Sequence, residues 1–284
     1  MTRGLGIFLL VAALPAAEIA GTDLLAPSLS TGLRQVAPAG ASVDLAGTMP
    51  ARRGLASGEV ACALLFLRPE EAAPTAPGGM ELVPFPFARA AAAIAVHRSN
   101  PIEQISLGSL AGVFARETTN PIGNWNELPI PGRTDLITAA LHSPEGSFVR
   151  ELFRGVVLES KAFREGVRLE TPAMQVKETL ASVSGALVVL PWVAVEDAKL
   201  LQVVDGRPGR SSTPYSPTGM NIYNGDYPLS LPLVLYLRKD KATAYAPLVR
   251  WVFSDEVAAR LQSSGLTPTP PAVRGRLLQR LDTR

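Results

Sequence analysis

The distribution of apolar and polar positions along this chain of 284 residues predicts an α/β fold. Short apolar runs, in the length range of buried strands, alternate with stretches whose apolar residues recur at helical spacing. The pattern predicts strands at 18–21, 42–47, 60–67, 80–87, 91–97, 135–142, 185–192, 200–205 and 231–237. It predicts helices at 25–36, 50–58, 106–115, 147–158, 172–183 and 241–264. Stretches rich in proline and glycine, at 69–79 and 206–219, are interpreted as surface loops.

The first residues of the chain are typical of a secretory signal peptide. Arg3 precedes an apolar run over residues 4–14, and the small residues Ala16 and Ala17 follow. The run is shorter than the roughly 20 apolar residues that a membrane-spanning helix needs. We therefore expect residues 1–17 to be a cleaved signal peptide and the mature protein to be periplasmic or secreted.

Charge and composition argue against several classes of function. The chain has 27 basic and 25 acidic residues and no long basic run, so a nucleic-acid partner is not expected. The two histidines, His97 and His142, show neither metal-ligand spacing nor a nucleophile-elbow pattern, and we interpret both as strand-end residues. Cys62 lies in an apolar run and is interpreted as a core residue. We expect no enzyme, no cofactor and no metal site, but a small-molecule ligand.

Three strand-to-helix junctions share one chemistry, which is glycine and a hydroxyl residue near the start of a helix. They are IAGTDLLAPSL (19–29), DLAGTMPARRGL (44–55) and LHSPEGSFVRELF (141–153). A helix N-terminus presents N–H groups without intrahelical partners and a partial positive charge, which together favour an oxyanion. If the three junctions converge, they can replace the hydration shell of a tetrahedral oxyanion.

Ordinary helix capping is the alternative explanation of each junction. Thr22, Thr48 and Ser143 belong to residue types that commonly cap helix N-termini. Pro50 and Pro144 suit the first position of a helix. Any single junction is therefore weak evidence for a ligand, and the prediction depends on all three being brought together.

The order of these segments resembles the phosphate-binding proteins of ABC transporters, the PstS-like group of the type 2 periplasmic-binding-protein superfamily. The similarity runs from about Ile19 to Pro270. The first junction resembles the family's G-S-x-T-x-x-P-L loop, and LASGEVACALLFLRPEE resembles L-x-x-G-x-A-D-I-x-x-x-S-R-P. The most specific match is ISLGSLAGVFARETTNPIGNWNELPIPG, which is similar to L-T-x-x-Q-L-x-x-I-F-x-G-x-x-x-N-W-x-x-L-G. Further matches are GSFVRELF, VSGALVVLPW, YPLSLPLVLYL and LVRWVFSDEVAARLQSSGLTPTP.

The resemblance implies two α/β lobes joined by two crossing strands, with a ligand cleft between the lobes and hinge closure on binding. Mapped onto this sequence, the crossings fall near 96–99 and 227–233. The first lobe would be discontinuous, with residues 18–96 and 230–284, and the second lobe would comprise 97–229.

The resemblance also implies a function. The protein would be an exported, monomeric solute-binding protein that binds phosphate or a related small oxyanion for ABC-type uptake, with an importer membrane component as its partner. Matching positions of the family's motifs assign the ligand contacts to Gly21, Thr22, Asp23, Leu24, Gly47, Thr48, Gly146, Ser147, Phe148 and Arg150.

Departures from the family pattern weaken the predicted site. Phe66 and Leu67 stand where the family has a polar residue and the aspartate that accepts the proton of bound phosphate. Phe148 and Val149 replace a glycine and a threonine. We expect phosphate to bind no tighter than roughly tens of micromolar, and a ligand with an apolar portion to be favoured instead. The alternative is a scaffold or sensor domain of the same fold that has lost phosphate binding.

Charges near the junctions act in both directions. Asp23 and Glu145 place negative charge at helix starts, where it repels an anion. Arg52, Arg53 and Arg68 are candidates to supply positive charge, since a guanidinium donates paired hydrogen bonds to an oxyanion. Arg52 and Arg53 are also explained as the solvated face of a helix.

A tryptophan in the turn after the predicted helix 106–115 is interpreted as structural. Leu110 and Phe114 recur at helical spacing and should pack inward. Trp125, followed by Leu128, should cover the end of the core of the second lobe.

Overall fold

A computed structural model describes residues 18–67, 71–130, 132–143, 147–170, 173–192, 198–207 and 209–282. The strands are β1 (Ile19–Gly21), β2 (Val43–Asp44), β3 (Cys62–Phe66), β4 (Leu82–Val96), β5 (Gln104–Ser106), β6 (Thr138–His142), β7 (Arg168–Glu170), β8 (Ala186–Pro191), β9 (Lys199–Leu200), β10 (Gln202–Val204), β11 (Ser230–Arg238) and β12 (Leu266–Pro268). The helices are α1 (Ala26–Val36), α2 (Thr48–Ser57), α3 (Leu107–Phe114), α4 (Phe148–Val156), α5 (Ala173–Ser182), α6 (Gly219–Asn224), α7 (Ala242–Val252), α8 (Asp255–Ser263) and α9 (Pro271–Asp282).

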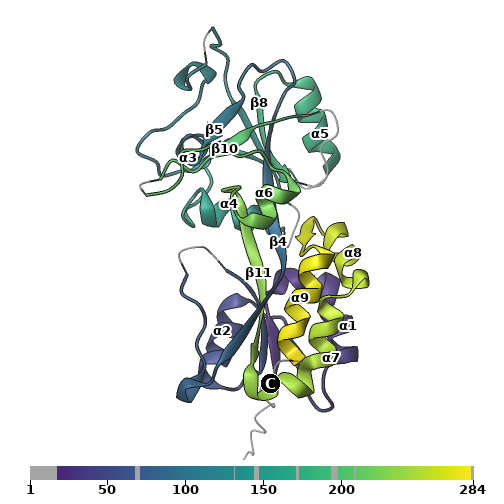
Figure 1. The fold of residues 1–284 in the computed structure, drawn as a ribbon. Helices are drawn as coiled ribbons and strands as arrows, with labels where there is room; N and C mark the ends of the chain where they lie inside the picture. Colours follow the sequence, from purple (N-terminus) through teal and green to yellow (C-terminus); the bar gives the residue numbers. More distant parts are fainter. Residues whose placement is uncertain are drawn as a thin grey trace, which may run out of the picture.

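The molecule has two lobes, one above the other in Figure 1. The first lobe, at the bottom, contains β1 to β3, β11, β12, α1, α2 and α7 to α9, and the second lobe contains β5 to β10 and α3 to α6. β4 belongs to both, because it pairs with β11 and β12 through its first part and with β8 and β9 through its last. The segment before β11 runs beside it, where the amide of Ala92 donates to the carbonyl of Leu229.

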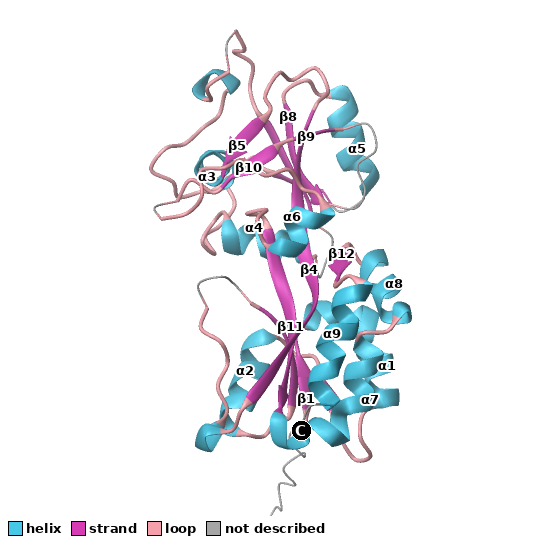
Figure 2. Cartoon of the chain, viewed as in Figure 1, coloured by secondary structure: helices cyan, strands magenta, loops and turns pink. Residues whose placement is uncertain are grey.

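The sheet of the first lobe brings the ends of its parallel strands to one edge. The strand order is β2-β1-β3-β11-β4, and β1 runs parallel to both β2 and β3. α2 covers one face, and α1 with α7 lies on the other (Figure 2). Because parallel strands end at the same edge, the junctions that follow β1 and β2 lie beside the end of β3.

The second lobe continues the sheet through β4-β8-β6-β7, with α4 and α5 on opposite faces. Val176 and Leu180 of α5 pack on Ala140 and Val188. On the other face, Phe153 of α4 joins the main apolar cluster. β10 and β5 form a separate parallel pair.

Two predicted strands, 80–87 and 91–97, are one continuous strand, β4. The predicted strand 80–87 already included the prolines at 84 and 86, and the predicted gap at 88–90 is part of β4. In the structure β11 pairs with this part of β4, and β12 on the other side reaches only residues 88–90. The carbonyl oxygens of Pro84 and Pro86 accept bonds from Arg280 and Thr269 instead of a strand. Among the described residues no strand pairs with the two prolines on that side of β4, so their missing N–H groups remove no ladder bond there.

The single helix predicted over 241–264 is two helices, α7 and α8. The chain leaves the helix at Phe253, and the side chain of Ser254 caps α8 by accepting from the amide of Val257 at 3.2 Å. Further elements that the sequence pattern did not predict are β5, β7, β12, α6 and α9. These elements are short or lie outside the predicted segments. The predicted strand 200–205 overlaps two strands, β9 and β10.

Trp125 is confirmed as a core residue. Its side chain is fully buried, and the indole Nε1 donates to the carbonyl of Gly185 at 3.2 Å. Leu110 and Phe114 are fully buried as predicted. Cys62 is also buried, which raises the pKa of its thiol.

Within the described ranges, every helix is too short or too polar to cross a lipid bilayer.

Candidate functional site

The first junction is built from backbone contacts that leave no space for a side chain at Gly21. A Cβ at that position would lie 2.8 Å from the carbonyl oxygen of Leu64 and 2.9 Å from Cδ2 of Leu45. The next amide, of Thr22, donates to the same carbonyl of Leu64 at 2.9 Å, and Thr22 is only 2% exposed. The chain then forms a short 3-10 turn, Asp23–Leu25, before α1 begins. Close packing of β1 on β3 therefore fixes the position of this junction.

The second junction is hydrogen-bonded to the first. The amide of Gly47 donates to the carbonyl of Gly21 at 2.9 Å, with Gly47 at φ 130, a conformation that favours glycine. Thr48 begins α2, and its Oγ1 accepts from the amide of Phe66, at the end of β3, at 3.4 Å. β3 thus contacts both junctions of the first lobe.

The third junction lies at the start of α4 in the second lobe. Ser147 is the N-cap, and its hydroxyl accepts from the amide of Arg150 at 3.4 Å. Ser143 comes five positions before the helix and is buried. Pro144, Glu145 and Gly146 lie outside the described residues. The structure therefore places the cap at Ser147 rather than at Ser143.

An aromatic contact joins the third junction to the first two. The rings of Phe66 and Phe148 meet edge to face, with centroids 5.7 Å apart and planes at 65°. Phe66 ends β3 in the first lobe, and Phe148 is the first residue of α4 in the second. The end of β3 therefore contacts all three junctions, through Leu64, the amide of Phe66 and the ring of Phe66.

The capping alternative is only partly right. Thr22 caps a 3-10 turn without a side-chain bond, and α2 is capped by Gly47, with Thr48 as its first residue. Pro50 accordingly lies at the third position of α2 rather than the first. The hydroxyl of Thr48 is engaged across the sheet edge instead, with the amide of Phe66.

Four side chains at or beside the predicted site differ in their surroundings. Leu67 is buried in the apolar cluster under α2, and Val149 is buried in the main core. Asp23 is exposed, and its Oδ1 accepts weakly from the hydroxyl of Thr22 at 3.4 Å. Leu24 is half-buried against the core of the first lobe.

On the α4 side of the contact between Phe66 and Phe148, one arginine side chain is exposed. Arg150 is exposed, and its Nη1 donates to the hydroxyl of Ser143 at 3.4 Å. Arg52 is engaged elsewhere, since it forms an ion pair with Glu71 at 3.2 Å. Arg53 is exposed on α2, as the solvated-face interpretation predicted, and Arg68 lies outside the described residues.

A basic residue near the strand crossing was not among the predicted site residues. Arg89 is half-buried on β4, and burial lowers the pKa of its guanidinium, while Tyr223 and Asp226 act in the opposite direction. A Cβ at Gly225 would lie 2.9 Å from its Nη2. A single arginine inside the apolar run FARAAAAIAV was the sequence signal that could have identified it.

Both histidines lie at strand ends, as predicted. His97 follows β4, and its Nδ1 lies 2.7 Å from the hydroxyl of Ser99. His142 ends β6 beside Glu170, its partner in register on β7. Burial lowers the pKa of His142, and among the described residues its Nδ1 has no hydrogen-bond partner. Within the described residues, no group of three or more His, Cys, Asp or Glu side chains is placed to hold a metal ion.

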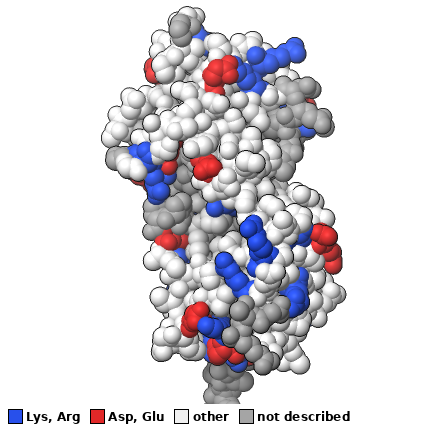
Figure 3. Space-filling view, viewed as in Figure 1, with Lys and Arg blue, Asp and Glu red and all other residues white. Residues whose placement is uncertain are grey.

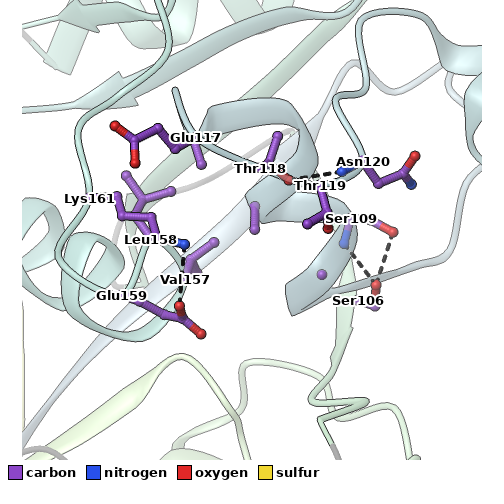
Figure 4. Close-up of a pocket in the computed structure, with 13 residues that line it drawn as sticks. Ser106, Ser109, Glu117, Thr118, Thr119, Asn120, Val157, Leu158, Glu159 and Lys161 are labelled. Carbon is purple, nitrogen blue, oxygen red and sulfur yellow. Dashed lines mark hydrogen bonds and ion pairs between the residues drawn. The ribbon is translucent and has the colours of Figure 1, made fainter.

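A pocket of about 790 Å³ lies in the second lobe, apart from the three junctions. Figure 4 shows Ser106, Ser109 and Thr118 on one side of it, with Lys161 and Glu159 opposite. Several of these groups bond one another: Ser106 and Ser109 through their hydroxyls at 2.9 Å, and Lys161 with Glu159 at 3.5 Å. A second groove, of about 450 Å³, borders Gly47 and Arg53 in the first lobe.

Figure 3 shows that uncharged residues make up most of the surface on this face, which narrows between the lobes. Basic side chains are spaced apart there rather than joined in one strip.

Solved structures with the same fold cover nearly the whole chain. A possible phosphate binding protein from Planctomyces limnophilus DSM 3776 is 18% identical, with a TM-score of 0.78 over 94% of this chain and 97% of that one. An ABC-type phosphate transport receptor from Vibrio cholerae is 19% identical, with a TM-score of 0.62 over 89% and 100%. PstS from Borrelia burgdorferi is 16% identical, with a TM-score of 0.62 over 89% and 98%. No curated protein sequence matches significantly.

These likenesses confirm the predicted two-lobed α/β fold. A family model described as a PBP superfamily domain matches residues 18–256, most of the chain. The match includes both crossing strands and all three junctions. The chain belongs to the PBP superfamily.

Proposed function

We propose that this protein is an exported solute-binding protein that binds phosphate or a related small oxyanion between its lobes for ABC-type uptake. The observation that carries the proposal is the end of β3, which contacts the helix starts of both lobes through Leu64 and Phe66. Further support comes from the superfamily match and from similar structures that are described as phosphate-binding or phosphate-transport proteins.

The predicted contact residues would have different roles in this site. The first two amides of α2 and of α4 would donate to the oxyanion, because they lack intrahelical partners, whereas the amide of Arg150 already donates to the hydroxyl of Ser147. The amides of Thr22 and Gly47 already donate within the protein, so these residues would position the loop instead. Arg150 would supply the positive charge.

The remaining contacts predicted from the family pattern complete the proposal. Asp23 and Leu24 would border the ligand from the 3-10 turn, and Thr48 and Phe148 from the helix starts. Gly146 lies outside the described residues and stays a prediction.

Hinge closure without covalent chemistry would be the mechanism. Lobe boundaries at 18–96 with 230–284, and at 97–229, are proposed with it. β4 is suited to a hinge because it joins both lobes. A side-chain hydrogen bond also links the lobes: Nε1 of Trp192 in the second lobe donates to the hydroxyl of Thr267 in the first at 3.0 Å. The start of α4 already contacts the first lobe through Phe148 and Phe66, and closure would bring the two sides closer around the ligand.

Export, assembly and partner follow the same proposal. Residues 1–17, which lie outside the described residues, would be a cleaved signal peptide. The mature protein would act as a periplasmic or secreted monomer and deliver ligand to the membrane component of an importer.

A scaffold or sensor role without phosphate binding is the second candidate. Leu67 and Phe148, which replace polar or small residues of the family pattern, are both buried, and the Phe66 ring fills space beside the helix starts. Such a protein would keep the two-lobed fold and lose its ligand.

Isothermal titration with inorganic phosphate separates the two candidates. The proposed function predicts saturable binding with a dissociation constant of roughly tens of micromolar or weaker. A thermal-shift panel of phosphate, sulfate, molybdate, phosphonates and small carboxylates extends the test, because ligand that binds the native state raises its stability. If no oxyanion shifts the melting temperature or gives heat, the scaffold or sensor role is favoured.

A further inference from the structure

The pocket of the second lobe has no role in the proposed function. It lies between the start of α3, the segment 115–120 after α3 and the segment 157–161 after α4. Its volume is about 790 Å³, and small-molecule sites commonly measure roughly 300 to 1,000 Å³. The pocket is therefore large enough to hold one small ligand.

Backbone contacts fix the walls of this pocket relative to one another. A Cβ at Gly112 of α3 would lie 2.6 Å from the carbonyl oxygen of Asn120, and the amide of Ile122 donates to the carbonyl of Gly112 at 2.9 Å. The amide of Arg116 donates to the carbonyl of Ala162 at 2.9 Å, which joins the segment after α3 to the segment after α4. A ligand would thus enter a largely preformed pocket and lose little affinity to ordering of the backbone.

Most of the side chains that line the pocket can form hydrogen bonds. Figure 4 shows the hydroxyls of Ser106 and Ser109 on one side, near Thr119 and Asn120. The two serine hydroxyls bond each other, but a hydroxyl has one donor and two acceptor sites, so both keep sites for a ligand. None of the described lining residues is aromatic, and the apolar part of the lining is Ala111, Ala115, Val157 and Leu158.

Three of the lining side chains are unpaired. Glu117, Thr119 and Asn120 are exposed, and within the described ranges none of their side chains has a hydrogen-bond or ion-pair partner in the protein. They belong to one short segment, which the contact with Gly112 holds against α3. A carboxylate, a hydroxyl and an amide are therefore presented together at the pocket.

The charges at the pocket favour a cation. Lys161 pairs with Glu159 at 3.5 Å, which leaves the charge of Glu117 without a partner among the described residues. Figure 4 shows Glu117 on the same side of the pocket as Lys161 and Glu159. An anion would meet an excess of one negative charge there, whereas an ammonium group would neutralise it.

We propose that this pocket binds an amino sugar or a similar polyhydroxylated amine, at a site separate from the proposed oxyanion site. The ammonium group of the ligand pairs with Glu117, and its hydroxyl groups exchange hydrogen bonds with Thr119 and Asn120. The carbon atoms of the sugar ring pack on the apolar part of the lining. A quaternary ammonium ligand does not fit this chemistry, because such ligands are recognised by aromatic rings.

NMR titration of the ¹⁵N-labelled protein tests the inference with four probes: glucosamine, glucose, N-acetylglucosamine and Nα-acetyl-lysine amide. The titration is made at about pH 6, where an amino group is protonated and a glutamate is ionised. We expect glucosamine to bind with a dissociation constant of about 1 mM and to shift the amide signals of Gly108 and Thr119. Glucose and N-acetylglucosamine should bind about threefold more weakly, since neither can form the exposed ion pair.

Two variants assign the binding to the pocket. Glu117→Gln should remove the preference for glucosamine over glucose, and Glu165→Gln, an exposed glutamate of the same lobe outside the lining, is its control. Gly108→Phe should weaken binding of glucosamine by about tenfold, because a Cβ there contacts only Oγ of Ser106, at 3.8 Å, and the ring can enter the pocket. Gly219→Phe is the matched control, since a Cβ at the start of α6 meets no atom within 4 Å. The melting temperature of each variant checks that it is folded.

Each outcome supports or overturns the inference. A preference for glucosamine that Glu117→Gln removes and Glu165→Gln keeps supports it. Absence of saturable binding, or equal binding of glucose and glucosamine, overturns it without bearing on the oxyanion site. If Nα-acetyl-lysine amide binds as tightly as glucosamine, the pocket recognises an amine alone, as in a lysine side chain of a partner protein, and the assignment to a sugar is wrong.

Discussion

The two sides of the candidate site are built in different ways. In the first lobe the backbone defines the site, because Gly47 donates to the carbonyl of Gly21 and Thr22 donates to that of Leu64. In the second lobe side chains define it, through the ring of Phe148 and the guanidinium of Arg150. A site anchored by backbone contacts keeps its shape while side chains opposite it change. Under the proposed function, the first lobe would therefore preserve an oxyanion site, and the second lobe would determine which oxyanion is accepted.

The largest expected effect is a loss of stability from a change in the first lobe, where backbone contacts define the candidate site. Gly21→Val places a side chain 2.8 Å from the carbonyl oxygen of Leu64, a backbone atom that cannot move aside easily. We expect the free energy of unfolding to fall by about 3 kcal/mol, measured by urea denaturation, and ligand affinity to fall with it. Gly275→Ala is the control, because a Cβ there meets no atom within 4 Å. A loss below about 1 kcal/mol for Gly21→Val would show that this junction is not tightly packed.

On the side-chain side, Arg150→Ala should weaken oxyanion binding without unfolding the protein. A charge-assisted hydrogen bond contributes about 1.5 to 3 kcal/mol, so titration should show a loss of about tenfold or more. Arg154→Ala, on the same helix, removes a charge that pairs with Glu151 and should leave affinity unchanged. Equal effects of the two variants would mean that the net charge of α4, rather than contact by Arg150, attracts the ligand.

Trp125→Phe tests whether the stability of the second lobe's core can be lowered without a change in ligand affinity. The change removes the hydrogen bond from the indole Nε1 to the carbonyl of Gly185 and leaves that carbonyl without this donor. The expected loss is about 1 kcal/mol in the free energy of unfolding, by urea denaturation, with unchanged ligand affinity. A large loss of affinity would show that Trp125 has more than a structural role.

The smallest expected effect is the pH dependence that His142 contributes. Burial lowers the pKa of His142 in the folded state, so the unfolded chain binds the proton more readily. Its contribution to stability is therefore complete above the ordinary histidine pKa of about 6.5 and is lost as pH falls through the lower, folded-state pKa. His142→Gln should reduce the fall in unfolding free energy at acid pH, as measured by urea denaturation at several pH values. His97→Gln, changed at the other strand end, is the control, and an identical pH profile for wild type and His142→Gln would contradict the prediction.

Sequence patterns located the elements of the first lobe and its junctions because the signals there are local. Gly21 and Gly47 reflect conformations and close contacts that depend on neighbouring residues, and the apolar run before Phe66 reflects a buried strand. The family resemblance supplied the two-lobed arrangement, which no local pattern contains. The pattern ended one strand at 87 and began another at 91, whereas β4 continues through 88–90, where it pairs with the distant strands β11 and β12.

The aromatic contact could not be predicted for the same reason. The sequence indicates that Phe66 and Phe148 replace other residues, but 82 positions separate them and their contact depends on how the lobes meet. Arg89 was missed because its surroundings come from α6, which has too few residues to give a clear helical pattern. The break between α7 and α8 had a local signal, Ser254 followed by two acidic residues, that the continuous apolar spacing concealed.

The pairing of β4 with β11 also has a consequence for the order of folding. The two strands are neighbours in the sheet, although the chain of the second lobe lies between them. Joining distant segments costs loop-closure entropy, and that cost falls once the intervening chain is compact. We expect the second lobe to become compact first and the sheet of the first lobe to be completed afterwards, when β11 and β12 dock on β4. A variant that slows collapse of the second lobe would then delay the first lobe as well, even though it changes none of the contacts there.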